Sequence, residues 1–407
     1  MSVAAPRRPL TVLVCAQVLS GAGLAAGITV GALLAEDLLG STGLAGVPSA
    51  LFTGGAALGA AAIGRLSQLR GRRLGLALGY GAGALGSLGV VAAAALHSAL
   101  LLFPSLLVYG AGTATNLMAR YAGAELVPPE RRGRAVSTVL VATTLGAVAG
   151  PNLVTVTGDL AVTWGVPRLA GPFLLAAAAF GAAAAVLAVR WRPEPPPAAG
   201  EPERSGADAP APDDPGRVRR RALAAGAAVM VLTQLVMIAL MTMTPVHLRA
   251  HGHGTQAAGL VIALHVGAMF LPSPLTGALV DRLGPHRVAA ASGVTLLGAG
   301  LLATLAPPHS VPALAVALVL LGVGWNFGLV SGTALVTAAL PPARRAATQG
   351  LVDVGIALAG ATGGVASGPV LAAGGFPVLA LACGALALAV VPVAVLAARD
   401  DGGARCP

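Results

Sequence analysis

The stretch GALVDRLGPHR, residues 277–287, concentrates charge in a chain of 407 residues of which only 10% are charged. A second stretch, GRLSQLRGRR at residues 64–73, repeats its skeleton of Gly, Leu and Gly at the same spacing and is also rich in Arg. The two differ at one telling position, because Gln68 stands where the first stretch has Asp281. A charged turn that recurs in an apolar chain indicates a duplicated unit.

A second pair of motifs supports this duplication. PPERR at 128–132 recurs as PPARR at 341–345, and Gly64 recurs as Gly277, so both pairs are 213 residues apart. Two separate motifs that share one offset predict an internal repeat of about half the chain.

Composition places the repeat in a membrane. Hydrophobic residues make up 56% of the chain, and its charged fraction lies far below the ~25% of soluble proteins. The net charge of +10 comes from Arg in the turns between apolar runs, and few aromatic residues accompany it, so a nucleic-acid partner is not expected. The sequence contains no Lys, which excludes a nucleotide-binding P-loop in these residues.

An apolar run of about 20 residues is needed to span the hydrocarbon of a bilayer. We predict twelve spans, near 11–34, 46–66, 74–96, 100–123, 134–157, 168–190, 222–246, 256–278, 288–307, 311–338, 347–371 and 375–398. The predicted domains are an N-terminal half at 1–190, a flexible linker at 191–220, a C-terminal half at 221–398 and a tail at 399–407. The linker is rich in Pro and charge and cannot bury enough apolar surface to fold.

Basic residues set the predicted orientation. With both chain ends and the linker in the cytoplasm, every Arg except Arg168 and Arg249 falls on the cytoplasmic side. An excess of basic residues in cytoplasmic loops is the usual rule for membrane proteins. We therefore expect a multi-pass protein of the bacterial cytoplasmic (inner) membrane with both termini inside.

These motifs resemble those of the major facilitator superfamily, whose signature turn joins the second and third helices of each half. The resemblance implies an all-α fold of twelve transmembrane helices in two pseudo-symmetric six-helix bundles. It also implies a cytoplasmic gate, which would comprise Gly64, Gln68, Arg70, Gly71, Arg72, Gly277, Asp281, Arg282, Gly284 and Arg287. LGAVAGPNL in the fifth span is similar to the glycine-proline motif of the 12-helix drug:proton antiporters, through Gly146, Gly150 and Pro151.

Polar residues inside the spans are candidates for a substrate cavity, because polar groups in a membrane usually face a cavity or a partner. In this superfamily the first, fourth, seventh and tenth helices line the cavity. The fourth span carries polar residues at i, i+4, i+7 and i+11, which places them on one helix face. The seventh span carries Met230, Gln234, Met237 and Met241 at the same spacing. The expected cavity residues are Gln17, Tyr109, Thr113, Asn116, Arg120, Gln234, Met237, Met241, Trp325 and Asn326.

Asp353 and His265 are ionisable residues within predicted spans and are candidates for proton coupling. For Asp353 a coupling role and a structural ion pair are equally consistent with the sequence, and for His265 a satisfied neutral imidazole is favoured. We expect Asp281 to approach the start of the fifth span, Gln68 to approach the start of the eleventh, and Asp353 to pair with Arg70 or Arg72.

The expected function is a proton-coupled exporter of small, moderately apolar molecules that works by alternating access. An importer or facilitator of a sugar, organic acid or amino acid is one alternative, and a receptor-like membrane protein without transport is another. We expect no enzymatic activity and no cofactor or metal. The expected partners are the substrate, protons and the lipid bilayer, with the chain acting as a monomer.

Overall fold

The computed structural model describes residues 7–39, 47–191 and 215–402, and within these ranges the chain is helical. The helices of the N-terminal half are α1 (Arg7–Leu39), α2 (Val47–Arg70), α3 (Arg72–Ala95), α4 (Ala99–Glu125), α5 (Arg132–Asn152), α6 (Val154–Thr163) and α7 (Gly171–Arg190). Those of the C-terminal half are α8 (Pro215–Ala250), α9 (Thr255–Phe270), α10 (Ser273–Leu283), α11 (Pro285–Leu305), α12 (Val311–Ala339), α13 (Pro342–Leu388) and α14 (Val390–Gly402).

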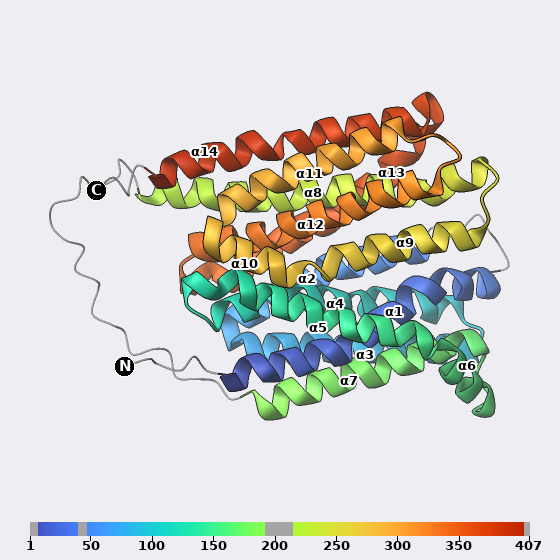
Figure 1. Ribbon diagram of the computed structural model, residues 1–407. Helices are drawn as coiled ribbons and strands as arrows, with labels where there is room; N and C mark the ends of the chain where they lie inside the picture. Colours follow the sequence, from blue (N-terminus) through green and yellow to red (C-terminus); the bar gives the residue numbers. More distant parts are fainter. Residues whose placement is uncertain (1–6, 40–46, 192–214, 403–407) are drawn as a thin grey trace.

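The helices form two bundles that lie side by side. In Figure 1, α1–α7 (blue to green) make the lower bundle and α8–α14 (yellow-green to red) make the upper one. We call the end of the bundles where α1 begins and α14 ends the terminal end; it lies on the left of Figure 1. The predicted all-α fold with two six-helix halves is confirmed.

The twelve predicted spans correspond to these helices, with three interruptions. The fifth span is broken after Asn152 into α5 and α6. The eighth is broken into α9 and α10 at Leu271–Pro272, where two prolines, Pro272 and Pro274, disrupt the helical hydrogen bonds. The eleventh span and most of the twelfth lie in α13, which bends sharply at Gly375, and the twelfth continues into α14. The φ of Gly375 is 75°, a value that favours glycine.

Length and composition support a membrane setting. Among the described residues, nine helical segments are long and apolar enough to cross a membrane, and one of them, 342–398, covers both the eleventh and the twelfth predicted spans. The boundaries of the predicted linker differ from the structure at one end, because α8 already begins at Pro215. Residues 192–214 of the linker and 403–407 of the tail lie outside the described residues.

Each half has its own apolar core, and the two cores meet near the terminal end. The N-terminal core is built around aromatic side chains, among them Tyr80, Tyr109 and Phe180. The C-terminal core also takes in Tyr121 and Val136 of the N-terminal half, so it continues across the boundary. The boundary is formed chiefly by α2 against α13 and by α5 against α10.

Candidate functional site

The two repeated turns cap helices of the opposite half. Asp281, near the end of α10, accepts hydrogen bonds from the backbone N–H of Gly133 (2.8 Å) and of Arg134 (3.2 Å) at the start of α5. Gln68, near the end of α2, accepts in the same way from Ala346 (2.9 Å) at the start of α13. The predicted approach of each turn to the opposite half is therefore confirmed, and each oxygen lies at the positive end of a helix dipole.

Glycines let the same helices approach closely. A Cβ on Gly64 would lie 2.9 Å from the carbonyl oxygen of Ala346 and 2.9 Å from the Cα of Gly350. A Cβ on Gly277 would meet the Ser137 side chain and would lie 2.5 Å from the Gly133 carbonyl oxygen. Both contacts join the halves near the terminal end, so the geometry that the two turns share closes this end of the molecule.

The remaining residues of these turns have varied surroundings. Arg72 donates to both carboxylate oxygens of Glu125, at 2.9 and 2.7 Å, and also contacts the Gln349 side chain in α13. Gly71 and Gly284 have φ values of 88° and 83°, so both turns use the left-handed backbone that glycine tolerates. Arg70 and Arg282 have exposed side chains, and Arg287 follows the start of α11 and is also exposed.

The predicted pairing of Asp353 with Arg70 or Arg72 is wrong, because its partner is Arg120 in α4. Arg120 Nη2 lies 2.6 Å from Asp353 Oδ1, and the two side chains are 0% and 2% exposed. The Tyr121 hydroxyl lies 3.4 Å from the same carboxylate oxygen. Arg72 instead bonds to Glu125, which removes it from Asp353's direct contacts.

Arg120 lies where several helices of the C-terminal half converge on α4. Its Nε donates to Thr333 Oγ1 in α12 (2.9 Å), and its Nη2 lies 3.8 Å from the Met230 sulfur in α8. Its Nη1 also donates to the Leu117 carbonyl oxygen (2.6 Å). The guanidinium is thus fully satisfied in a buried position, and an ion pair between the halves holds them together at this depth.

Three of the predicted cavity residues lie in the interior of the N-terminal half in this structure. Gln17 is 0% exposed and donates to the Asn116 carbonyl oxygen and to Thr143. Asn116 donates to Ser20 of α1 at 2.7 Å. Tyr109 is also 0% exposed, and its hydroxyl donates to the Gly23 carbonyl oxygen at 2.7 Å. Partners in the same half satisfy all three.

Asn326 is likewise buried and hydrogen-bonded in this structure. It is 0% exposed, and its amide nitrogen donates to the Met269 carbonyl oxygen and to Ser273, both at 2.7 Å. Its amide oxygen accepts from Thr276 at 2.5 Å. These groups lie beside the break between α9 and α10, so Asn326 hydrogen bonds to backbone and side-chain groups at that break.

The other predicted cavity residues differ in their exposure, and Trp325 is 5% exposed. Trp325 donates its indole N–H to Gln234 at 2.7 Å, and its ring meets Phe270 edge-on at 5.7 Å between centroids. Gln234 is partly exposed. Thr113 is also partly exposed, and its buried hydroxyl oxygen has no hydrogen-bond partner among the described residues. Met241 is partly exposed, whereas Met237 is buried in the C-terminal core.

His265 lies in α9 and is fully buried. Its Nδ1 lies 2.8 Å from the Leu318 carbonyl oxygen, and its Nε2 has no partner within the described part of the chain. A neutral imidazole that donates from Nδ1 fits this arrangement. No group of three or more His, Cys, Asp or Glu side chains in the described ranges could hold a metal ion.

The glycine-proline motif lies where α5 packs on α1. A Cβ on Gly146 would collide with the Val18 carbonyl oxygen and would lie 2.9 Å from the Cα of Gly21. Gly150 and Pro151 stand just before the end of α5 at Asn152, and their side-chain surroundings lie outside what the structure describes.

Three residues complete the polar centre, by which we mean the Arg120–Asp353 pair and its contacts: Tyr121, Thr333 and Met230. Sequence reasoning did not single out Tyr121 or Thr333, and it identified Met230 only as part of a helical stripe. Tyr121 is adjacent to Arg120 in sequence, and Thr333 lies at the repeat offset from it. The offset therefore carried a signal for Thr333 that helical spacing alone did not.

Comparisons with known proteins agree with this architecture. The family model described as Major Facilitator Superfamily matches residues 13–272 and 227–405. The chain is 53% identical over 393 residues to the uncharacterized MFS-type transporter YdeG of Bacillus subtilis (strain 168), covering 96% of this chain and 91% of that protein. It is 31% identical over 351 residues to the riboflavin transporter RfnT of Brucella anthropi, covering 86% and 85%. The human organic anion transporter MFSD10 (TETRAN) has a similar fold, with a TM-score of 0.75, 17% identity, and coverage of 95% and 99%.

Proposed function

Because the chain belongs to the major facilitator superfamily of membrane transporters, we propose that it is a proton-coupled secondary transporter that exports small, moderately apolar molecules. The observation that carries the coupling is the buried ion pair between Arg120 of one half and Asp353 of the other. Alternating access requires the two halves to part in turn at each end of the molecule. The pair must therefore break when the terminal end opens.

The physical cost of breaking the pair suggests the coupling step. A buried charge that loses its partner destabilises a protein by about 3–5 kcal/mol. A proton on Asp353 would neutralise the carboxylate and weaken its hold on Arg120, so the halves could separate. Each proton that moves down a membrane potential of 100 mV supplies about 2.3 kcal/mol. Asp353 is thus our candidate for the proton-carrying group, with Arg120 as the partner that senses its charge.

We place the terminal end at the cytoplasmic face of a bacterial cytoplasmic membrane. Arg residues gather at this end, while Arg168 and Arg249 lie at the opposite end of their helices. The asymmetry is what the positive-inside rule expects. A single copy of the chain contains both halves of the proposed machinery, which fits a monomer.

The expected binding region lies between the halves, at Trp325, Gln234, Thr113 and Met241. It joins an indole, a carboxamide, a hydroxyl and a flexible thioether, and thioethers adapt to ligands of different shapes. Export is favoured by the likeness of Gly146, Gly150 and Pro151 to the antiporter motif. This region would accept molecules that are largely apolar with one or two hydrogen-bonding groups.

A planar heteroaromatic such as riboflavin is a second candidate substrate, for import or export. RfnT, which is 31% identical over 351 residues, is named as a riboflavin transporter. The partly exposed Phe270 ring, which meets the buried Trp325 ring edge-on, and the Gln234 carboxamide would offer aromatic and hydrogen-bonding surface to a flat ring system.

Transport into everted vesicles tests the proposal, with riboflavin and the dye ethidium as the first probes. We expect accumulation that a protonophore abolishes. Asp353→Asn should lose proton-driven accumulation but retain exchange of labelled for unlabelled substrate, and Asp353→Glu should keep coupling because it keeps a titratable carboxylate. The matched control is Asp159→Asn, which removes a carboxylate from the exposed pair with Arg168 (2.8 Å).

The outcomes separate the parts of the proposal. Accumulation by Asp353→Asn equal to that of the wild type across pH would rule out Asp353 as the coupling group. Uphill uptake into intact cells, without efflux, would overturn export and favour an importer. If Asp353→Asn does not yield folded protein, the result for Asp353→Glu and the effect of protonophore on the wild type still decide the question.

A further inference from the structure

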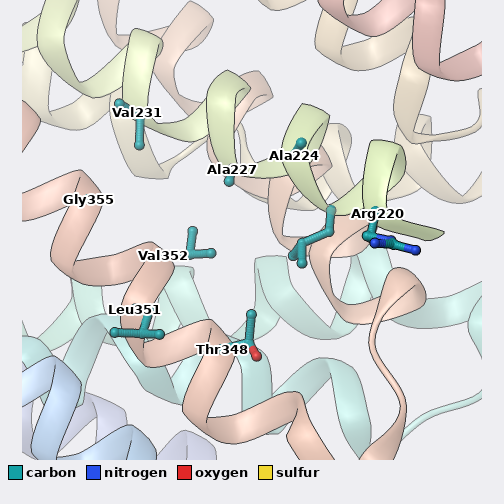
Figure 2. Close-up of a pocket in the computed structure, with 9 residues that line it drawn as sticks. Arg220, Ala224, Ala227, Val231, Thr348, Leu351, Val352 and Gly355 are labelled. Atoms are coloured by element: carbon teal, nitrogen blue, oxygen red, sulfur yellow. The ribbon is translucent and has the colours of Figure 1, made fainter. Parts of the chain in front are cut away.

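A groove opens on the side of the C-terminal half, between α8 and α13 (Figure 2). Its volume is about 360 Å³, and its walls are almost wholly apolar. From α8 they comprise Leu223, Ala224, Ala227 and Val231, and from α13 Leu351, Val352 and Gly355. Leu351 is 64% exposed, so this surface faces outward from the bundle and, in a membrane protein, toward lipid.

Polar groups occur at one end of the groove only. Arg220 lies near the start of α8 and Thr348 near the start of α13, so both belong to the terminal end, and Figure 2 shows them on either side of the groove. Arg219 and Arg221 flank Arg220 and are exposed. The groove therefore combines an apolar channel with a basic mouth at the level where a membrane meets water.

The length of the groove fits one leaflet of a bilayer. Arg220 and Val231 are eleven residues apart on α8, and at about 1.5 Å per residue they are separated by ~16 Å along the helix axis. Half of a hydrocarbon core of about 30 Å is ~15 Å. A headgroup held at Arg220 would therefore let an acyl chain lie along the groove to the middle of the membrane.

We propose that this groove binds an anionic phospholipid of the leaflet at the terminal end. The phosphate is recognised by Arg220 and its basic neighbours, with the Thr348 hydroxyl as a further hydrogen-bond donor, and an acyl chain occupies the apolar channel. Basic clusters beside transmembrane helices on the cytoplasmic side attract anionic headgroups in this way. The residues of the proposed substrate region are not among those that line the groove, and the test needs no transported substrate.

The bound lipid would contact a helix that is central to the boundary between the halves. Thr348, Leu351 and Val352 face the groove, whereas Gly350 of the same helix faces Gly64 of α2. Asp353, which follows Val352, points to Arg120. A lipid in the groove would therefore pack against the outer side of α13, while Gly350 and Asp353 on the inner side of the same helix contact the N-terminal half.

Native mass spectrometry of the full-length protein in detergent tests the proposal directly. Phosphatidylglycerol and phosphatidylcholine with identical acyl chains are titrated in parallel, and we expect tighter binding of phosphatidylglycerol. Arg220→Gln should weaken phosphatidylglycerol binding about fivefold, the factor that corresponds to one basic residue near an anionic surface. The matched control is Arg190→Gln, which removes an exposed Arg at the end of α7, at the same end of the molecule but in the other half.

A second variant tests the apolar channel. Ala227→Phe fills the groove without a change in charge and should reduce the binding of both lipids, while thermal unfolding confirms that the variants are folded. Equal binding of the two lipids by the wild type, or equal binding by the Arg220→Gln and Arg190→Gln variants, would overturn the proposal. Complete displacement of phosphatidylglycerol by inorganic phosphate would also overturn it, because the site would then recognise a free anion.

Discussion

Arg120 and Thr333 occupy equivalent positions in the two halves, and they hydrogen bond to each other across the boundary at 2.9 Å. Their separation of 213 residues equals the offset between the repeated turns. Equivalent positions can touch only near the axis that relates the halves, so α4 and α12 cross there. The polar centre at Arg120 therefore lies at the pivot of the molecule.

The contents of this centre are asymmetric, although its geometry is not. The position equivalent to Asp353 at the same offset is Leu140, and the position equivalent to Arg120 is Thr333. The centre therefore contains one ion pair, whereas a symmetric repeat of the two charged residues would have given two. A single titratable pair at the axis acts on both halves at once.

Removal of one member of the pair should harm stability more than removal of both. Arg120→Met leaves the Asp353 carboxylate buried without its partner, and we expect a loss of about 3–5 kcal/mol. Asp353→Leu should cost a similar amount for the reciprocal reason. The double variant removes both charges and should be more stable than either single variant, as measured by thermal unfolding in detergent.

The same measurement gives the coupling between the two residues. The free energies of unfolding of the wild type, the two single variants and the double variant form a thermodynamic cycle, and residues in contact are expected to couple by at least 0.5 kcal/mol. Additive losses in the double variant would contradict a direct ion pair.

A carboxylate at position 68 should strengthen the closed terminal end. Gln68 offers a neutral oxygen to the Ala346 N–H near the start of α13, whereas Asp281 offers a charged one to the Gly133 N–H near the start of α5. Charge at a helix N-terminus contributes about 0.3–1 kcal/mol, so Gln68→Glu should raise the melting temperature and slow turnover. Asp281→Asn should have the opposite effect on the melting temperature. Identical shifts from the two substitutions would argue against dipole capping at these turns.

Much of this arrangement could be predicted from the sequence because the repeat preserves spacing. Gln68 and Asp281 each follow a glycine of the shared skeleton, and equivalent turns must meet equivalent helices in the opposite half. The twelve spans were also predictable, since each needs only a long apolar run. The breaks at Pro272 and Gly375 follow from residues that interrupt helical hydrogen bonding or favour unusual backbone angles.

The polar residues of α4 could not be assigned by the same means. Helical spacing places Tyr109, Asn116 and Arg120 on one face, but the neighbour of that face changes along the axis. At Tyr109 and Asn116 the face meets α1, and at Arg120 it meets α8, α12 and α13. A central helix is covered on every side, so periodicity does not distinguish a cavity from the interior of its own half.

A methyl group at position 64 should hold the terminal end apart. Gly64→Ala places a Cβ about 2.9 Å from two backbone atoms of α13, which cannot move as a flexible side chain can. Such overpacking costs about 1–3 kcal/mol in the closed state. The matched control is Gly81→Ala in α3, where a Cβ would have nothing within 4 Å.

Spin-label distances between the halves measure this effect. Labels at Arg70→Cys and Arg344→Cys, both exposed at the terminal end, are introduced after Cys15, Cys383 and Cys406 have been replaced by Ser. Gly64→Ala should increase the population with the longer distance, and Gly81→Ala should leave the distribution unchanged. A wild-type distribution for Gly64→Ala would show that the glycine contact does not limit closure.

The amides of Asn326 and Gln234 should respond to substitution in different ways, because the first is fully buried and the second is partly exposed. Asn326→Leu leaves the Met269 carbonyl oxygen and the Ser273 hydroxyl without their buried partner. A buried polar group left unsatisfied costs about 1–3 kcal/mol, so we expect a lower melting temperature and an unchanged KM in the protein that remains folded.

Gln234→Leu removes a partly exposed carboxamide whose contact is the Trp325 N–H. It should change the melting temperature less than Asn326→Leu does, and it should raise KM because a hydrogen-bonding group of the binding region is lost. Measurement of both quantities for both variants decides the assignment: a raised KM for Asn326→Leu with an unchanged melting temperature would return Asn326 to the cavity.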